Sequence, residues 1–189
     1  MITTPDTSRW LRRSTPNPNA SLRCFCLPYA GGSARIFQTW SQSLPDNVEV
    51  CALELPGHGM RLTESPIQNW DTMLEAISQV IQPFCDRPFV FFGHSMGALI
   101  SFELARYCRR HNLPMPSHLY VSGHRAPQLP DPEEPVHNLP EPAFREKLTR
   151  LQGTPPAVLN SEEFMAMLLP VLRADFTLCE TYSYVPEPP

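Results

Sequence analysis

The sequence predicts an α/β fold, in which helices flank a mainly parallel sheet. Short, continuous apolar runs that are typical of buried strands alternate with segments whose apolar residues recur every three or four positions, as in amphipathic helices. The strand-like runs cover residues 22–27, 48–53, 88–92 and 118–122. Most of the eight glycines follow these runs closely, and the carboxyl edge of a parallel sheet is where open α/β folds bind their ligands. We therefore expect the functional residues at these strand ends.

Composition limits the class of protein. Of the 189 residues, 42% are hydrophobic and 18% are charged, which suits one packed domain and excludes a disordered or collagen-like chain. The net charge is −4 and the basic residues are scattered, so we expect no nucleic-acid partner. The six cysteines form no Cys-x-x-Cys pair, which favours reduced, buried thiols over disulfides or a metal site.

The apolar stretches also bear on the compartment. The first twenty residues contain no apolar run of signal-peptide length. The longest later stretch, residues 164–172, is interrupted by Pro170 and is far shorter than the roughly 20 residues of a membrane span. The sequence therefore predicts a cytoplasmic protein with no membrane partner.

The local patterns predict the following helices and connections. Residues 1–20 are polar, rich in proline, asparagine and serine, and without periodicity, which predicts a loose leader. Apolar residues at helical spacing over 36–44 predict a first helix, with Ser33 as its N-cap. A second, amphipathic helix is predicted over 67–84 and a third over 98–110.

The pattern changes after His124. Residues 126–142 are rich in proline and acidic residues, and short helical patterns follow at 142–151, 161–169 and 171–184. Because this segment follows an α/β core over residues 21–125, we expect residues 126–184 to form a helical lid. Residues 185–189 are expected to begin a further part of the core.

The motif G-x-S-x-G occurs between a buried strand and a predicted helix, as Gly93-His94-Ser95-Met96-Gly97. In a nucleophile elbow the serine occupies a strained strand-to-helix turn, and small residues two positions before and after it let the two backbones approach. The hydroxyl is then exposed at a helix N-terminus, where the helix dipole favours developing negative charge. This context favours Ser95 as a nucleophile over a chance occurrence of the motif.

A tetrahedral oxyanion on such a serine needs two N–H donors. One is expected from the residue after the nucleophile, Met96. The other is expected from the loop after the first strand, Tyr29-Ala30-Gly31-Gly32, where Ala30 is the first choice and Tyr29 the second. A phosphate-binding loop is a weaker interpretation, because neither G-x-G-x-x-G nor G-x-x-x-x-G-K-[ST] is present.

Four segments together resemble the type II thioesterases, the stand-alone α/β-hydrolases that accompany nonribosomal peptide, polyketide and fatty acid synthases. These segments are PYAGGSA (28–34), LPGHGMR (55–61), FGHSMGA (92–98) and LRADF (172–176). The resemblance implies an α/β-hydrolase fold with a helical lid and hydrolysis of acyl groups from the phosphopantetheine arm of a carrier protein. It also implies a monomer that needs no cofactor or metal of its own.

The resemblance assigns roles to individual residues. Ser95 would be the nucleophile, and Met96 and Ala30 would supply the oxyanion hole. The loop of residues 55–61 would border the entrance to the site, and Asp175 would be structural rather than catalytic. The residues expected to support these loops are Gly31, Gly32, His58, Gly93, His94 and Gly97. We expect the His94 side chain to point away from Ser95, into supporting structure.

The order of catalytic residues in this fold is Ser, then Asp or Glu, then His, and no histidine follows His137. In the family the catalytic Asp follows a strand beyond the lid. The sequence therefore predicts that the catalytic Asp and His are not present in this chain, that the C-terminal strands and helix of the core are missing, and that turnover is low or undetectable. His58 and His124 lie at neighbouring strand ends but are weak candidates for a substitute base.

Two alternatives remain open. The same fold and serine could hydrolyse small oxygen esters, or the chain could be a non-catalytic remnant that binds carrier proteins or acyl chains. A metal enzyme is disfavoured, because no His or Cys cluster has ligand spacing.

Overall fold

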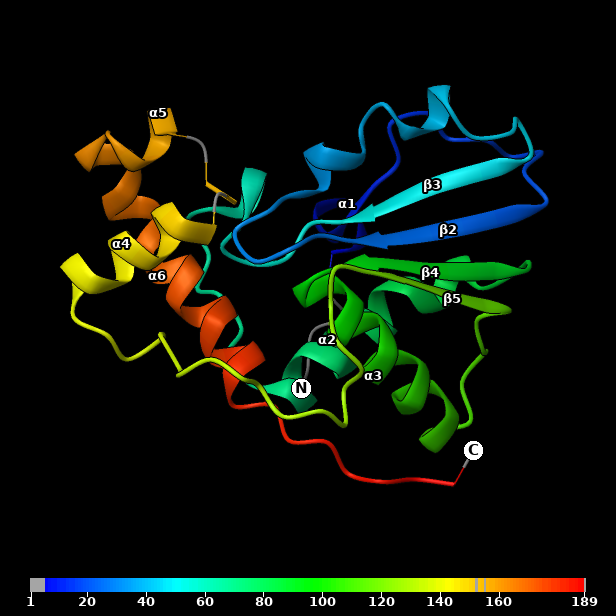
Figure 1. The fold of residues 1–189 in the computed structure, drawn as a ribbon. Coiled ribbons are helices and arrows are strands. Elements are labelled where there is room, and N and C mark those ends of the chain that lie inside the picture. The colour runs from blue at the N-terminus through cyan, green and yellow to red at the C-terminus, as the bar shows by residue number, and fades with distance from the viewer. Residues whose placement is uncertain (1–5, 152, 155, 189) are drawn as a thin grey trace.

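The computed structural model describes residues 6–151, 153–154 and 156–188, and their fold is organised around one five-stranded sheet (Figure 1). The strands lie in the order β1-β3-β2-β4-β5, in which β2 to β5 are parallel and β1 is antiparallel to β3. Their bounds are β1 Leu11–Arg12, β2 Leu22–Leu27, β3 Val48–Leu53, β4 Phe89–His94 and β5 His118–Ser122. The predicted α/β fold with a mainly parallel sheet is confirmed.

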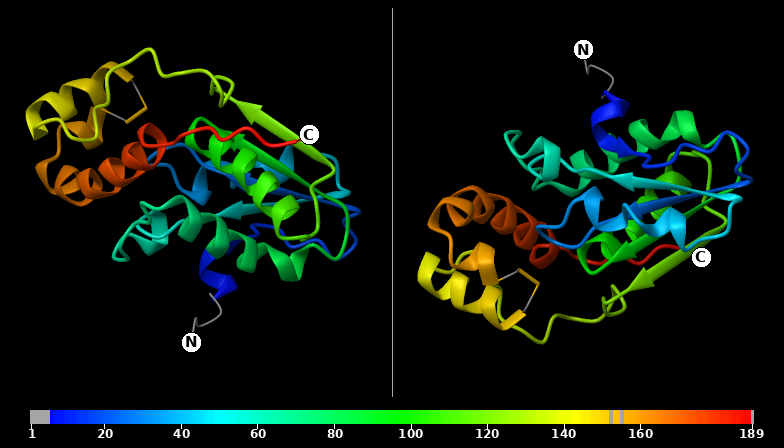
Figure 2. Two further views of the ribbon diagram at one scale, coloured as in Figure 1. Left: turned by 90° about the horizontal axis from the view of Figure 1, so that it is seen from below. Right: turned by 90° about the horizontal axis from the view of Figure 1, so that it is seen from above.

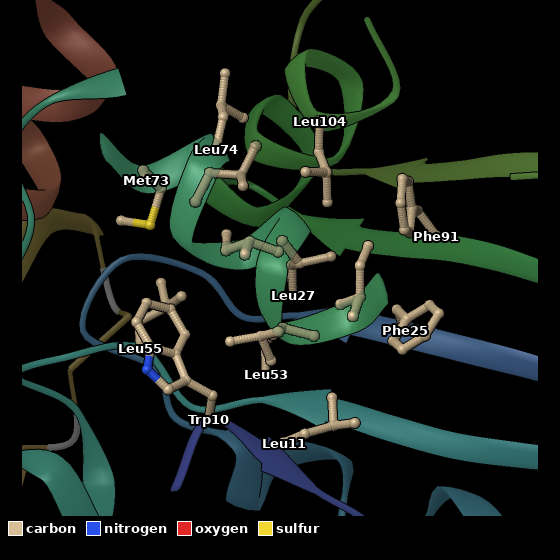
Figure 3. Packing of buried hydrophobic residues seen from close by; sticks show 14 of the residues in the cluster. Trp10, Leu11, Phe25, Leu27, Leu53, Leu55, Met73, Leu74, Phe91 and Leu104 are labelled. Carbon is tan, nitrogen blue, oxygen red and sulfur yellow. The ribbon is translucent and has the colours of Figure 1, made fainter. Parts of the chain in front are cut away.

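One face of the sheet is covered by the helices α2, Trp70–Ile81, and α3, Met96–Arg110 (Figures 1 and 2). Alternate strand residues point to this face, and Phe25 and Phe91 pack here with their rings 6.1 Å apart (Figure 3). Because β2 and β4 are central and buried on both faces, their sequences are continuous apolar runs. The core thus fixes the carboxyl ends of β2 and β4, where the sequence predicts the functional residues.

The other face carries two short 3₁₀ helices, η1 Ala34–Phe37 and η2 Trp40–Gln42. The single helix predicted over 36–44 is therefore wrong, and Ser33 makes no side-chain capping bond. Residues three apart align along a 3₁₀ helix, which places Phe37 and Trp40 together. Both rings pack on Phe92 of β4, with centroids 6.0 and 4.7 Å from its ring.

The N-terminal segment is also more ordered than the sequence suggests. Asp6 caps a short helix, α1 Thr7–Trp10, and β1 then pairs with β3. Trp10 and Leu11 are buried in the main core (Figure 3). The prediction of a loose leader is wrong for these residues, because two apolar side chains bury themselves against the sheet. Residues 1–5 lie outside the described part of the chain.

A helical block lies beyond the carboxyl ends of the parallel strands (Figure 1). It consists of α4 Glu141–Leu151, α5 Pro156–Leu159 and α6 Glu162–Glu180. Its core includes Phe144, Leu148 and Met165. Two helices were predicted where α6 is continuous through Pro170. The apolar residues on both sides of Pro170 pack into the protein, which compensates for the backbone hydrogen bond that proline removes.

After α6 the chain runs extended along α3 (Figure 2). The Tyr182 hydroxyl donates to Glu103, and Arg106 donates to the Val185 carbonyl. The Glu187 carboxylate pairs with Arg109 at 2.8 Å. Among the described residues, no helix is long and apolar enough to cross a membrane.

Candidate active site

Ser95 occupies a strained turn between β4 and α3. Its backbone has φ 52° and ψ −116°, a conformation that non-glycine residues rarely adopt. The turn is fixed from the neighbouring strand, because the Ser95 N–H donates to the Ser122 carbonyl at 2.8 Å. A Cβ on Gly97 would lie 2.1 Å from the Leu27 carbonyl oxygen, so only glycine allows α3 to start this close to β2. The geometry is that of a nucleophile elbow.

Ser95 lies at the wall of a cavity of about 670 Å³ between the sheet edge and the helical block. The sheet side includes Tyr29 and Ala30, and the helical block contributes Leu148 and Leu172. A cavity of this size accommodates a small-molecule or acyl ligand. Ser95 is therefore accessible to a ligand in this cavity.

We call residues 28–33, which follow β2, the oxyanion loop, after the role that the sequence predicts for them. Gly32 donates to the Tyr29 carbonyl at 2.8 Å, closing a turn around Ala30. Within the described part of the chain the Ala30 N–H has no hydrogen-bond acceptor. Met96 is the first residue of α3, so its N–H has no acceptor within the helix. Ala30 lines the cavity together with Ser95, whereas Met96 is fully buried and does not line it. The assignment of these two N–H groups as oxyanion donors stays a prediction.

Asp175 of α6 joins this loop to the loop that follows β3. Its Oδ2 accepts a hydrogen bond from the Gly31 N–H at 2.7 Å and lies 2.8 Å from His58 Nε2. Both side chains are buried, with 3% of His58 and 1% of Asp175 exposed. Burial by itself lowers the pKa of His58, but the hydrogen bond and charge of Asp175 outweigh it and raise that pKa above its ordinary value.

The chain matches the thioesterase domain family over residues 23–189. It belongs to that family. The gramicidin S biosynthesis protein GrsT of Aneurinibacillus migulanus is 46% identical over 182 residues, which cover 96% of this chain and 71% of that protein. The thioesterase PikA5 of Streptomyces venezuelae is 38% identical over 96% of this chain and 64% of its own length.

Solved structures agree with this assignment of the thioesterase domain. RedJ, a thioesterase of prodiginine biosynthesis in Streptomyces coelicolor, superposes with a TM-score of 0.82 at 40% identity, over 90% of this chain and 67% of that one. The type II thioesterase BorB of the borrelidin cluster superposes with a TM-score of 0.81 at 34% identity. The match covers 98% of this chain and 75% of the BorB chain. The resemblance to type II thioesterases is confirmed.

Two histidines of this thioesterase domain, His94 and His124, line the cavity together with Ser95. His94 bonds Ser122 Oγ through Nδ1 at 3.0 Å, as a supporting residue would, but it is exposed and lines the cavity. The prediction that it points into supporting structure is therefore only partly correct. His124 also lines the cavity, with Nδ1 2.8 Å from the Arg125 carbonyl. Among the described residues, no side chain forms a hydrogen bond with Ser95 Oγ.

His58 is not part of the cavity wall, since none of residues 55–61 lines it. Pro56 and His58 are buried, whereas Gly59 and Met60 of the same loop are exposed. The expectation that this loop borders the entrance stays a prediction. Because His58 is bonded to Asp175 and does not line the cavity that holds Ser95, it is a poor candidate for a substitute base. Among the described residues, no group of His, Cys, Asp and Glu side chains is arranged to bind a metal ion.

Sequence patterns did not reveal the contact of Asp175 with Gly31. The only local signal is the spacing of Leu172 and Asp175, which lie three residues apart and therefore on one face of a helix. Leu172 is as close to the loop as Asp175, because a Cβ on Gly31 would be 2.6 Å from Leu172 Cδ2. That face of α6 both lines the cavity and contacts the oxyanion loop.

Proposed function

We propose that this site hydrolyses acyl thioesters held on the phosphopantetheine arm of a carrier protein, with Ser95 as the nucleophile. The observation that carries the proposal is the strained Ser95 turn, which presents the hydroxyl at the N-terminus of α3 and at the wall of the cavity. Strained conformations cost free energy and persist where the surrounding structure enforces them, most often at active sites.

In the first step Ser95 Oγ attacks the thioester carbonyl carbon. The hydroxyl proton passes to a general base, and the carbonyl oxygen becomes an oxyanion. The N–H groups of Ala30 and Met96 donate to that oxygen, and the positive end of the α3 dipole adds to its stabilisation. The carbon–sulfur bond then breaks, which leaves an acyl group on Ser95 and releases the pantetheine thiolate.

The leaving group sets a modest demand on the enzyme. A thiol has a pKa of about 8.5, far below that of an alcohol, so the thiolate departs without the strong acid assistance that an alkoxide needs. In the second step water attacks the acyl-enzyme and releases the carboxylic acid. His94 and His124 are the imidazoles that share the cavity with Ser95.

The relatives support the substrate class. GrsT is named for gramicidin S biosynthesis, and PikA5 is named a thioesterase. A human relative, 35% identical over 86% of this chain, is the medium-chain thioesterase of fatty acid synthase. The first name prints a biosynthetic pathway, the second a thioesterase, and the third both a thioesterase and the synthase that assembles an acyl chain. We therefore propose an acyl or peptidyl carrier protein as the partner.

The test compares matched substrates on the wild type and on Ser95→Ala. Acyl-pantetheine thioesters and oxygen esters of the same acyl groups are incubated with each protein, and both substrate loss and the intact protein mass are followed. We expect thioester consumption to exceed oxygen-ester consumption and an acyl adduct that maps to Ser95 and is absent from Ser95→Ala. Thioester loss that persists in Ser95→Ala would overturn the proposed role of Ser95.

Carrier binding separates the proposal from the non-catalytic alternative. An acyl carrier protein loaded with a non-hydrolysable acyl amide is titrated against the wild type and Ser95→Ala. Equal binding together with no Ser95 adduct from any thioester would show a binding protein and overturn the proposed hydrolysis.

A further inference from the structure

The Ala30 N–H belongs to a peptide whose orientation is fixed on both sides. In a trans peptide the C=O and N–H groups point in opposite directions. The Tyr29 carbonyl accepts from Gly32 at 2.8 Å, so the N–H of the same peptide, that of Ala30, points away from the turn. The next peptide is fixed by the Gly31 N–H, which donates to Asp175 Oδ2 at 2.7 Å. Losing this second bond frees the peptide that follows the oxyanion donor.

The carboxylate that holds Gly31 comes from the helical block. Gly31 has φ +74°, and the space that a Cβ would occupy is filled by Leu172. Leu172 and Asp175 are buried on the same face of α6. The oxyanion loop therefore packs directly on α6, and its Gly31 peptide bonds to a charged group of that helix.

The hydrogen bonds of His58 define its protonation state. Its Nδ1 lies 3.0 Å from the Pro56 carbonyl oxygen and its Nε2 lies 2.8 Å from Asp175 Oδ2. Both partners are acceptors, and a neutral imidazole has only one N–H. Asp175 Oδ2 already accepts from Gly31, as a carboxylate does. Both bonds are satisfied when His58 is an imidazolium and Asp175 is ionised.

The surroundings favour this charge state. Besides Asp175, the acidic group near His58 is Glu54, whose charge also raises the pKa of the imidazole. The Arg61 guanidinium donates to the Glu54 carbonyl and pairs with the carboxylate of Glu64. Burial and the charge of Asp175 raise the pKa of Cys179 on the next turn of α6, so this thiol stays neutral. A buried carboxylate is stable only when paired, and His58 supplies the charge that pairs with Asp175.

We propose that Asp175 and His58 are positioning residues of the oxyanion hole: the ionised Asp175, paired with the His58 imidazolium, fixes the Gly31 peptide and thereby aims the Ala30 N–H at the acyl oxygen. This inference rests on the proposed function of Ser95 and Ala30. It makes the helical block part of the catalytic geometry, since the charge that orients the loop is on α6. Neither side chain lines the cavity, so neither touches the substrate.

Nuclear magnetic resonance tests the bond without any turnover. In protein labelled with ¹⁵N-glycine, the Gly31 amide proton is expected far downfield, because a short bond to a carboxylate deshields it. Asp175→Asn and His58→Gln are expected to move this resonance upfield. The resonance of Gly93, a buried glycine of β4 that packs against the first turn of α3, reports whether a variant has kept its fold and should not move.

The chain offers a matched control on the same helix. Glu180 of α6 also pairs with a histidine, His137, at 2.6 Å, but it holds the backbone of residues 136 and 137 instead of the oxyanion loop. Glu180→Gln should leave the Gly31 resonance in place. If Glu180→Gln shifts Gly31 as much as Asp175→Asn does, the specific role of Asp175 is overturned.

A second spectrum reads the protonation state of His58 directly. With ¹⁵N-histidine, the imidazolium pattern with both ring nitrogens protonated is expected at pH 7, assigned by its loss in His58→Gln. A neutral tautomer at pH 7 would overturn the ion-pair part of the proposal.

Kinetics test the positioning role. A misplaced oxyanion donor lowers the rate of the chemical step, and we expect Asp175→Asn to slow Ser95 acylation about tenfold to a hundredfold with little change in KM. If Ser95 is never acylated, the proposed function fails while the resonance test still stands. If Ser95 is acylated equally fast in Asp175→Asn and the wild type, the positioning role alone is overturned.

Discussion

Gly93, near the end of β4, lies directly against Gly97 in the first turn of α3, so that a Cβ on Gly93 would be 2.0 Å from the Gly97 carbonyl oxygen. Ser95 stands between these two glycines. Their contact lets the strand reverse into the helix within one turn, and this tight reversal produces the positive φ of Ser95. Ser95 therefore owes its position at the cavity wall to two residues that carry no side chain.

Substitution of either glycine should unfold the elbow. Because the clashing atoms are backbone atoms that cannot rotate away, we expect Gly97→Ala to lower the free energy of unfolding by about 3 kcal/mol. Urea denaturation measures this, with Gly153→Ala as the control, since a Cβ at Gly153 meets no atom within 4 Å. Equal stabilities of Gly97→Ala and Gly153→Ala would contradict the close approach.

The hydroxyl of Ser101 in α3 is, among the described residues, the only buried side-chain polar atom without a partner. Removing an unsatisfied buried hydroxyl relieves its desolvation cost, so we expect Ser101→Ala to raise the free energy of unfolding by about 1 kcal/mol. Ser78 in α2 is the control, because it is also buried but donates to the Glu75 carbonyl at 2.8 Å. Ser78→Ala should leave the free energy of unfolding almost unchanged. If both variants raise it equally, the unpaired hydroxyl of Ser101 does not explain the effect.

Pro170 lies in the interior of α6 and is exposed. Proline inside a helix costs about 3 kcal/mol relative to alanine, of which packing in α6 recovers a part, so we expect Pro170→Ala to stabilise the protein by about 1–3 kcal/mol. Thermal unfolding measures the change. Pro142 lies in the first turn of α4, where a backbone N–H would have no acceptor within the helix, so proline breaks no helical hydrogen bond there. Pro142→Ala should therefore change stability far less.

Glu49 and Arg23 form a buried ion pair at 2.7 Å. Burial raises the pKa of Glu49, but the hydrogen bond from Arg23 outweighs it and lowers the pKa below the ordinary 4.5. The pair therefore stabilises the fold above pH 4.5 and loses this contribution as the pH falls through the lower, folded-state pKa.

We expect Glu49→Gln to cost about 3 kcal/mol at pH 7, because it removes the buried partner of Arg23 and leaves only the exposed Asp86 to pair with its charge. The difference from the wild type should shrink below pH 4.5 in denaturation experiments at several pH values. Glu146→Gln removes an exposed pair with Arg150 and should show almost no difference at any pH. If the difference in free energy of unfolding between the wild type and Glu49→Gln stays constant down to pH 3, the pairing of Glu49 with Arg23 is contradicted.

His58 gives the opposite pH dependence. Its pKa is raised above the ordinary 6.5 because the hydrogen bond and charge of Asp175 outweigh the opposing effect of burial. Its contribution to stability is thus complete below pH 6.5 and is lost as the pH rises through the folded-state pKa. The stability difference between the wild type and His58→Gln should accordingly narrow at alkaline pH, whereas His118→Gln, at an exposed position, should show no such trend.

Much of the sheet was accessible from sequence because β2, β3 and β4 are mostly buried and therefore read as continuous apolar runs. The exposed edge strand β5 was found from its apolar residues and its place in the alternation of strands and helices. The bounds of β2, β3 and β5 agree with the apolar runs, and β4 is offset by one or two residues. The elbow was also predictable, since a glycine pair around a serine is a local pattern. These features depend on residues close together in the chain.

What sequence reasoning missed depends on distant contacts. Edge strand β1 has two residues, too few for any period, and exists because Leu11 packs into a core built by other strands. The contact of His58 with Asp175 joins residues 117 positions apart, and each residue alone is an ordinary loop or helix residue. The role of Asp175 appears only when α6 is placed over the oxyanion loop.

The dual contact of α6 has a consequence for how acyl preference can change. Leu172 shapes the cavity and touches Gly31, so a substitution that enlarges the cavity there also disturbs the groups that govern rate. Leu148 and Leu151 of α4 also line this cavity. At Leu172 a change of acyl preference is therefore coupled to the rate. The exposed Leu151 of α4 is the position where the cavity can be reshaped without disturbing either the oxyanion loop or the core of the helical block.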